Sequence, residues 1–189
     1  MAAKAVFIDR DGVVNEEREY LHRIEEFRFI EGVFDACRMF QRHGYRIVIV
    51  TNQSGIGRGY YTEREYTRLT EWMVGEFAQQ GITITDVLHC PHHPDEGRAG
   101  YRVACGCRKP APGMLLEAAR RHHLDLSRSL MIGDKEADVA AGRAAGVWRT
   151  ILVRSGHPIE ESATRADQVI DSLGALEALQ RIITQQEAE

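Results

Sequence analysis

Apolar positions along the chain occur in two alternating kinds of stretch, short runs and longer periodic segments. The short runs, which are typical of buried β-strands, span residues 4–8, 45–50, 82–88, 130–132 and 148–153. The longer segments, which repeat apolar side chains every three or four positions, span residues 32–43, 62–80, 112–123, 136–145 and 172–183. Strands and helices that alternate in this way predict an α/β fold, with a parallel sheet covered by helices on both faces.

Local signals support the ends of several helices. Thr62 is followed three positions later by Glu65, which matches a capping box and predicts a helix start. Pro112 suits the first turn of its helix, because proline has no N–H to leave unpaired there. Gly44 and Gly146 follow the last periodic positions of two helices and predict their ends.

Polar residues follow three of the predicted strands at the point where each strand ends. Asp9 follows the first strand, Thr51 and Asn52 follow the second, and Asp134 follows the run over 130–132. In open parallel sheets, ligands bind at the carboxyl ends of the strands. We therefore expect these three strand ends to converge on one crevice.

Two carboxylates lie close together after the first strand, at Asp9 and Asp11, and Gly12 permits a tight bend there. Two acids in one crevice repel each other, so they need a nearby cation or different pKa values. Asp134 supplies a third carboxylate from a separate strand end. Oxygen ligands around an open position are typical of Mg²⁺ sites that also bind a substrate phosphate. Taken alone, the first segment is equally compatible with a surface turn.

Further polar residues suit a phosphoryl group. Thr51 offers its hydroxyl and neighbouring backbone N–H groups to phosphoryl oxygens, and Lys109 offers a positive charge. Asp138 follows Asp134 by four positions on one helix face, where it is able to hold Lys135 or a metal-bound water. Taken singly, Thr51 is an ordinary strand-end residue and Lys109 an ordinary surface lysine. Together and in this order, they favour a phosphate site.

A polar loop over residues 90–109 carries four potential metal ligands. They are Cys90, His92, Cys105 and Cys107. Three thiolates and one imidazole form a closed tetrahedral set, which is typical of structural Zn²⁺, and a metal is expected to order this polar loop. His93 is the alternative to His92 as the nitrogen ligand. A group of free cysteines is the alternative to a metal site.

Composition limits the classes of partner. The 189 residues carry 24 basic and 28 acidic side chains, and the net charge of −4 disfavours a surface that coats nucleic acid. No apolar run approaches the roughly 20 residues that span a bilayer, and none suits a signal peptide. We expect a cytoplasmic protein with one domain over residues 1–189 and without membrane or nucleic-acid partners.

The ordered motifs resemble those of the haloacid-dehalogenase-like (HAD-like) phosphohydrolases. These motifs are Asp9-x-Asp11-Gly12-x-Val14, Thr51-Asn52, Lys109-Pro110 and Gly133-Asp134-x-x-x-Asp138. The resemblance covers residues 5–153 and implies a Rossmann-like doubly wound sheet and Mg²⁺-dependent phosphoryl transfer through an aspartyl-phosphate. It implies that Asp9 is the nucleophile and Asp11 the general acid and then base. Thr51 and Lys109 would stabilise the phosphoryl group, and Asp9, Asp134 and the backbone carbonyl of Asp11 would bind Mg²⁺.

Three features narrow this resemblance: the expected zinc loop over residues 90–109, the short segment after the first motif, and the lack of a large cap domain. They are similar to the branch of the family that acts on heptose bisphosphates or on histidinol phosphate. Arg108-Lys109 and the acidic segment over 17–20 favour hydrolysis of the C7 phosphate of a heptose bisphosphate, during lipopolysaccharide synthesis. Histidinol phosphate or another small phosphomonoester is the alternative substrate.

By the same resemblance, a set of eleven residues is expected to contact the substrate. They are Glu17, Arg18, Glu19, Tyr20, Thr51, Asn52, Gln53, Ser54, Arg108, Lys109 and Lys135. A zinc-stabilised interaction module is the non-catalytic alternative, which the complete set of motif residues disfavours. Without a large cap, a monomer with an open site is expected.

The glycine-rich segment over 54–59 follows a strand but lacks the G-x-G-x-x-G spacing of dinucleotide-binding sites. The chain also contains no G-x-x-x-x-G-K-[ST] sequence, so it is not a P-loop nucleotidase. We expect the three glycines to let a loop close over the site.

Overall fold

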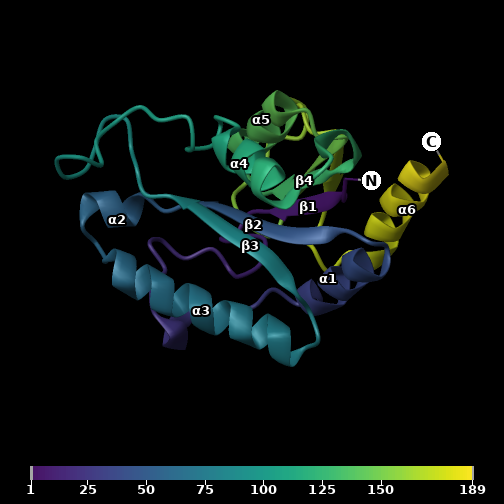
Figure 1. The fold of residues 1–189 in the computed structure, drawn as a ribbon, viewed down its shortest axis with the longest axis horizontal. Coiled ribbons are helices and arrows are strands. Elements are labelled where there is room, and N and C mark those ends of the chain that lie inside the picture. The colour runs from purple at the N-terminus through teal and green to yellow at the C-terminus, as the bar shows by residue number, and fades with distance from the viewer. Residues whose placement is uncertain (1, 189) are drawn as a thin grey trace.

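The computed structural model describes residues 2–188, which form strands and helices in alternation (Figure 1). The strands are β1 (Ala5–Ile8), β2 (Arg46–Asn52), β3 (Ile84–Cys90), β4 (Leu130–Gly133), β5 (Arg149–Val153) and β6 (Gln168–Ile170). The α-helices are α1 (Val33–Arg42), α2 (Ser54–Arg58), α3 (Glu63–Gln79), α4 (Gly113–His122), α5 (Glu136–Ala145) and α6 (Leu176–Ala188). Short 3₁₀ turns cover Ile24–Glu26 and Leu126–Arg128.

The strands form one parallel sheet in the order β3-β2-β1-β4-β5-β6. The chain proceeds outward from β1 through β2 to β3, then returns to the other side of β1 and proceeds through β4 to β6. This is the strand order of Rossmann folds, in which the ligand crevice lies where the winding changes direction. The predicted doubly wound α/β fold is confirmed, and the crevice is expected at the carboxyl end of β1.

Side chains of the strands alternate between two hydrophobic cores, one on each face of the sheet. In β1, Val6 and Ile8 join the core formed with α1, α3 and α6, whereas Ala5 and Phe7 join the core formed with α4 and α5. Figure 1 shows these two groups of helices on opposite sides of the sheet. Because both faces are buried, the central strands read as nearly continuous apolar runs in the sequence.

Two elements near the end of the chain differ from the sequence prediction. β6 is absent from the prediction, since its three residues are too few to show an alternation. The last helix begins at Leu176, not at Ser172, and runs to Ala188. Ser172 Oγ accepts a hydrogen bond from the Gly174 N–H at 3.1 Å, so residues 172–175 form a turn instead.

The glycine-rich segment forms the short helix α2, and the expectation of a closing loop is wrong. A Cβ at Gly55 would collide with the ring of Tyr61, and one at Gly57 would collide with the carbonyl oxygen of Pro91. Gly59 ends the helix in the left-handed region, with φ of 81°. The glycines therefore permit close packing of α2 against its neighbours.

Other local predictions are confirmed. Thr62 Oγ1 accepts from the Glu65 N–H at 3.2 Å, and Glu65 Oε2 accepts from the Thr62 N–H at 2.7 Å, which completes the capping box of α3. Between β1 and α1 the only helix is the 3₁₀ turn over 24–26, so no cap domain is inserted there.

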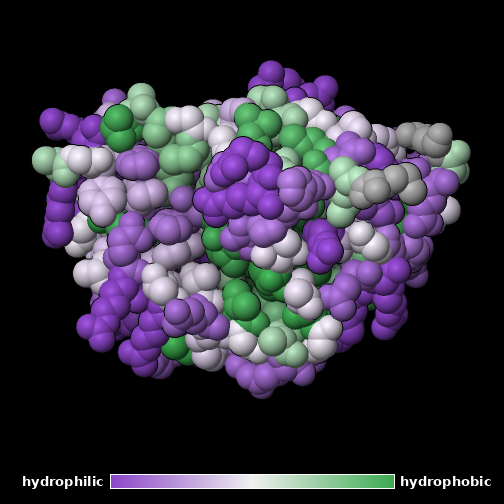
Figure 2. Space-filling view, in the orientation of Figure 1, coloured by the Kyte–Doolittle hydropathy of each residue, from purple (hydrophilic) through white to green (hydrophobic). Residues whose placement is uncertain are grey.

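Within residues 2–188, no helix is both long and apolar enough to cross a membrane. Figure 2 shows hydrophilic side chains over much of one face of the molecule.

Candidate active site

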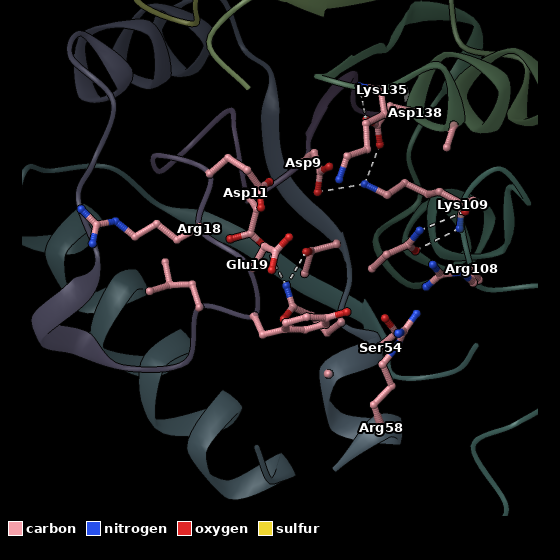
Figure 3. Close-up of a pocket in the computed structure, with 18 of the residues that line it drawn as sticks. Asp9, Asp11, Arg18, Glu19, Ser54, Arg58, Arg108, Lys109, Lys135 and Asp138 are labelled. Atoms are coloured by element: carbon pink, nitrogen blue, oxygen red, sulfur yellow. Dashed lines mark hydrogen bonds and ion pairs between the residues drawn. The ribbon is translucent and has the colours of Figure 1, made fainter. Parts of the chain in front are cut away.

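Asp9 lies directly after β1, at the carboxyl edge of the sheet. Its backbone N–H donates to the carbonyl oxygen of Ile132 in β4 at 2.9 Å, which holds the residue against the neighbouring strand. Asp9 Oδ1 lies 2.9 Å from Lys109 Nζ, which also lies 2.6 Å from Asp138 Oδ1 (Figure 3). Lys109 Nζ further donates to the carbonyl oxygen of Val50 at 2.8 Å. The buried lysine is thus fixed between two carboxylates.

The charges in this group are unbalanced. Burial raises the pKa of Asp9 to about 8; Lys109 opposes this change, and nearby carboxylates reinforce it. Burial alone would lower the pKa of Lys109, but Asp138 and Asp9 more than offset this effect and raise it above its usual value. Asp134 adds a further carboxylate close by. Such an excess of buried negative charge favours the binding of a cation.

Asp134 lies after β4 in a narrow cradle. Its Oδ2 accepts from the His157 backbone N–H at 3.0 Å and from His157 Nδ1 at 2.6 Å. A Cβ at Gly12 or at Gly156 would collide with this carboxylate, so both glycines allow the backbone to approach it. The buried Oδ1 of Asp134 has no hydrogen-bond donor among the described residues. An orphaned buried oxygen is costly, and a bound metal would satisfy it.

Oxygen atoms of the carboxylate cluster (Asp9, Asp134 and Asp138) all lie within 4.8 Å of one another. Asp138 is engaged elsewhere, because it pairs with Lys109 and its Oδ2 accepts from the Lys135 backbone N–H at 3.0 Å. Its side-chain partner is therefore Lys109, where the sequence suggests Lys135 or a water. Asp9 and Asp134 are the two carboxylates left to hold a hard divalent cation, and their oxygen donors fit one.

The Asp11 carboxylate is held by N–H donors from three side chains. Arg10, which is only 1% exposed, donates to Asp11 Oδ1 from Nε at 3.1 Å and from Nη2 at 2.9 Å. Asn15 Nδ2 donates to the same oxygen at 3.0 Å, and Gln53 Nε2 donates to Oδ2 at 2.9 Å. The side chain of Asp11 is consequently fixed outside the carboxylate cluster and at the wall of a cavity.

A cavity of about 360 Å³ opens at this edge of the sheet, and its lining contains every predicted substrate contact. These residues are Glu17, Arg18, Glu19, Tyr20, Thr51, Asn52, Gln53, Ser54, Arg108, Lys109 and Lys135. Asp9 and Asp11 also line it. Asp134 instead borders a neighbouring cavity of about 250 Å³ together with His157.

The basic residues around the cavity differ in direction (Figure 3). Lys135 extends toward Asp9, whereas Arg58 and Arg108 reach the same distant part of the cavity. Arg18 points away from Asp9, and its Nη2 lies 3.6 Å from Glu16 Oε2. Arg58 Nη1 is paired with Glu96 Oε2, so Arg108 is the residue left to supply positive charge at this distant part of the cavity. Lys135 supplies it beside Asp9. Two separate positive groups suit a substrate with two anionic groups.

Several residues around the site are not singled out by the sequence, and Arg10 and Asn15, which hold Asp11, are two of them. Arg58 and Tyr61 line the cavity, and His157 holds Asp134. His157 follows β5 by four positions, so the rule about polar residues after strands, applied at Val153, would have found it. Arg58 and Tyr61 give no comparable signal, because the sequence pattern does not predict α2.

Two hydrogen bonds join the end of β2 to the segment that carries Lys109. Asn52 Nδ2 donates to the Lys109 carbonyl oxygen at 2.9 Å, and the Lys109 N–H donates to Asn52 Oδ1 at 3.0 Å. Asn52 lines the cavity, but both ends of its amide are used to hold the Lys109 backbone in place.

The four predicted metal ligands of the polar loop meet at one point, which we call the Cys/His cluster (Cys90, His92, Cys105 and Cys107). The three Sγ atoms lie 3.1–3.5 Å apart, and His92 Nδ1 lies 3.5–3.6 Å from two of them. A tetrahedron of these atoms around Zn²⁺ has edges of roughly 3.6–3.8 Å at the usual bond lengths, so the donor set fits that ion. His93 Nδ1 instead accepts from two backbone N–H groups, which favours His92 as the nitrogen ligand.

The sheet and α2 both support this cluster. Cys90 pairs with Asn52 as the last residue of β3, two positions beyond the predicted strand end. The Arg98 N–H donates to the Gly57 carbonyl oxygen at 2.7 Å, which ties the loop to α2. Arg108 Nη1 donates to the His92 carbonyl oxygen at 3.2 Å, so the direction of this arginine depends on the cluster.

Comparison with known proteins decides the family. A family model described as HAD-hydrolase-like matches residues 106–176. The D-glycero-β-D-manno-heptose-1,7-bisphosphate 7-phosphatase of Vibrio cholerae is 48% identical over 174 residues, which cover 92% of this chain and 94% of that protein. This chain belongs to the same family of HAD-like phosphatases. It is therefore a phosphoric monoester hydrolase.

Other relatives agree with this membership of the HAD-like phosphatases. The protein of the same name from Escherichia coli K12 is 46% identical over 173 residues, 91% of each chain. The solved D,D-heptose 1,7-bisphosphate phosphatase of B. bronchiseptica, complexed with magnesium and phosphate, is 31% identical, with a TM-score of 0.81. That comparison covers 94% of this chain and 99% of the other.

Proposed function

We propose that this protein hydrolyses the C7 phosphate of D-glycero-β-D-manno-heptose 1,7-bisphosphate, as part of heptose synthesis for lipopolysaccharide. The observation that carries this proposal is the 48% identity to a relative of that name over 92% of the chain. The two separate groups of basic residues in the cavity support a bisphosphorylated substrate.

In the first half of the reaction, a carboxylate oxygen of Asp9 attacks the phosphorus at C7, and the bond between phosphorus and the sugar oxygen breaks. Asp11 gives its proton to that departing oxygen, because an alkoxide is a poor leaving group. The products are an acyl phosphate on Asp9 and a free C7 hydroxyl. Lys109, 2.9 Å from Asp9, and the hydroxyl of Thr51 stabilise charge on the phosphoryl oxygens.

In the second half, the Asp11 carboxylate takes a proton from a water molecule, and the water oxygen attacks the phosphorus. The bond between phosphorus and Asp9 breaks and releases inorganic phosphate. The Asp9 carboxylate and the protonated Asp11 are thereby restored. The N–H donors on Arg10, Asn15 and Gln53 keep the Asp11 carboxylate at the cavity wall between the two halves.

Mg²⁺ fits the acidic end of the site, with Asp9, Asp134 and the backbone carbonyl of Asp11 as the proposed ligands. When bound, it supplies positive charge that reduces the repulsion between the Asp9 carboxylate and the substrate phosphate. The orphaned Oδ1 of Asp134 and the excess of buried carboxylates support this assignment. The solved relative from B. bronchiseptica was obtained with magnesium and phosphate.

The Cys/His cluster is proposed as a structural Zn²⁺ site. A set of three thiolates and one imidazole leaves no open position for a substrate, so a structural role suits it better than a catalytic one. The hydrogen bond from Arg108 to the His92 carbonyl oxygen supports a link between this metal and the direction of a substrate contact.

Release of inorganic phosphate tests the substrate. Purified protein with Mg²⁺ should hydrolyse heptose 1,7-bisphosphate with a higher kcat/KM than fructose bisphosphate or histidinol phosphate. Retention of phosphate at C1, followed by ³¹P NMR, should identify C7 as the reacting position. A clear preference for histidinol phosphate would overturn the proposed substrate while leaving the family unchanged.

Further expectations stay predictions. Zinc content per chain, in protein purified without chelators, tests the structural site, and a chain without bound metal would contradict it. Size-exclusion chromatography with light scattering tests the expected monomer, and cell fractionation tests the expected cytoplasmic location.

A further inference from the structure

Gln53 is expected to contact the substrate, but its side chain is occupied inside the protein. The residue is only 3% exposed. Its Nε2 donates to Asp11 Oδ2 at 2.9 Å and to Thr51 Oγ1 at 2.8 Å, and its Oε1 accepts from the Tyr61 hydroxyl. Both N–H groups and the carbonyl oxygen of the amide therefore have protein partners, and no donor is left for a sugar hydroxyl.

Chemistry fixes the orientation of this amide. In its ionised form the carboxylate of Asp11 only accepts hydrogen bonds, so the NH₂ end of Gln53 faces it. The carbonyl end then faces Tyr61, whose hydroxyl must donate. Burial raises the pKa of Tyr61 above its usual value, which keeps that hydroxyl protonated.

The same amide also sets the direction of the Thr51 hydroxyl. A hydroxyl has one proton, and Thr51 Oγ1 already accepts from Gln53 Nε2. Its own O–H is therefore free to donate to an acceptor in the cavity that it lines. The buried side chain of Gln53 thus links Asp11, the proposed proton donor, with Thr51, which faces the phosphoryl group.

We propose that Gln53 is a positioning residue, and that it does not contact the substrate: its amide sets the Asp11 carboxylate and the Thr51 hydroxyl relative to Asp9. This inference rests on the proposed function, in which Asp11 protonates the leaving oxygen and Thr51 contacts the phosphoryl group. Loss of the amide should weaken proton transfer to the leaving group more than it weakens phosphate binding.

Two aryl phosphates without a sugar test the proposal. Phenolate is a more basic leaving group than p-nitrophenolate, so phenyl phosphate depends more strongly on a well-placed acid. We expect Gln53→Met to lower kcat/KM for phenyl phosphate about tenfold more than for p-nitrophenyl phosphate, since small displacements of a catalytic group have large effects. Because kcat/KM reports the steps up to release of the phenol, hydrolysis of the acyl phosphate does not enter the comparison.

Graded variants and a matched control accompany this measurement. Gln53→Glu should lower kcat/KM for both aryl phosphates further, because a second carboxylate would face Asp11 without donating to it. Tyr61→Phe removes only the partner of Oε1 and should have a smaller effect than Gln53→Met. Tyr66→Phe removes a buried hydroxyl from the same hydrophobic cluster but outside this bridge, and it should keep the wild-type ratio of the two esters. Thermal unfolding of each variant shows whether it folds.

The outcomes separate this inference from the proposed function. If Gln53→Met lowers kcat/KM for heptose bisphosphate while both aryl phosphates keep wild-type values, Gln53 is a sugar contact and the proposal is overturned. Equal losses for the two aryl phosphates in Gln53→Met, with a changed ratio in Asp11→Asn, would also overturn it. An unchanged ratio in Asp11→Asn would overturn the proposed acid role, and the inference with it.

Discussion

The carboxylate cluster and the Cys/His cluster hold their side chains by different means. Asp9 and Asp134 directly follow central strands that are packed between two apolar cores. In the Cys/His cluster, only Cys90 lies in a strand, and the chain from 91 to 112 contains no helix or named strand. Backbone pairing and core packing therefore place the carboxylate cluster. The side chains of the Cys/His cluster depend instead on the Zn²⁺ that we propose they bind.

The same difference separates the residues around the cavity into two groups. Asp9 belongs to the sheet, but Arg108 and Lys109 directly follow the last ligand of the Cys/His cluster. Asn52 provides a second support for Lys109 through its two backbone hydrogen bonds. Loss of the zinc that we propose for the Cys/His cluster should consequently disturb the cations of the site while leaving the acids in place.

The largest effect is expected from Asp9→Asn, which removes the proposed nucleophile from the region that the sheet positions. Turnover of heptose bisphosphate should fall by at least about 10³-fold, because an amide does not form the acyl phosphate. The thermal unfolding midpoint should not fall, since one charge is removed from a crowded group of buried carboxylates. Turnover near the wild-type level would exclude Asp9 as the nucleophile.

Cys107→Ser tests the other region. We expect less than wild-type zinc per chain, faster proteolysis between residues 94 and 104, and a kcat reduced about tenfold because Lys109 loses support on one side. Metal analysis, limited proteolysis and phosphate release measure the three effects. Cys37→Ala, which alters a buried cysteine in α1, is the control and should keep its zinc. If the two variants behave alike, the Cys/His cluster does not order the loop.

His157→Ala asks how far the sheet alone orients Asp134. The imidazole donates to Asp134 Oδ2 at 2.6 Å, so its loss should lower the affinity for Mg²⁺ about tenfold. Calorimetric titration with Mg²⁺ measures this directly, and the Mg²⁺ concentration for half-maximal activity should rise in parallel. His157→Asn, which keeps a donor, should recover part of the affinity. His122→Ala, at the end of α4 where the imidazole contacts Asp86, should leave the Mg²⁺ affinity unchanged. A similar shift there would contradict the role of His157.

The smallest effect is expected at the protein surface away from the cavity. There, Glu187 of α6 accepts a hydrogen bond from His43 at 2.9 Å. This contact lowers the pKa of Glu187 below its usual 4.5. The stabilisation is therefore complete above pH 4.5 and is lost as the pH falls below it. Thermal unfolding of Glu187→Gln should differ slightly from wild type above pH 4.5 and match it well below. Glu177→Gln on the same helix is the control, and an equal difference at both pH values would exclude this pair as the cause.

Prediction from the sequence was most successful where function follows from position along a strand. Asp9, Thr51 and Asp134 were expected to converge on one crevice. Asp9 and Thr51 line the same cavity, while Asp134 lies close to Asp9 but borders the neighbouring cavity. All three lie at one edge because the carboxyl ends of neighbouring parallel strands meet there. Gln53 and Asn52 show the limit of that reasoning. Both were expected to contact the substrate and both line the cavity, but their amides are engaged with protein atoms that sequence spacing does not reveal.

By itself, the sequence determined the order of the five longer strands and five longer helices, the edge of the sheet at which the acids gather, and the three cysteines of the Cys/His cluster. These features follow from periodicity, strand ends and ligand spacing, which are local properties of the chain. Only the tertiary structure decided that Lys109 lies between Asp9 and Asp138, that His92 rather than His93 joins the cysteines, and that His157 supports Asp134. Hydrogen bonds and ion pairs act over about 3 Å and depend on direction, so they are decided only when distant segments are packed together.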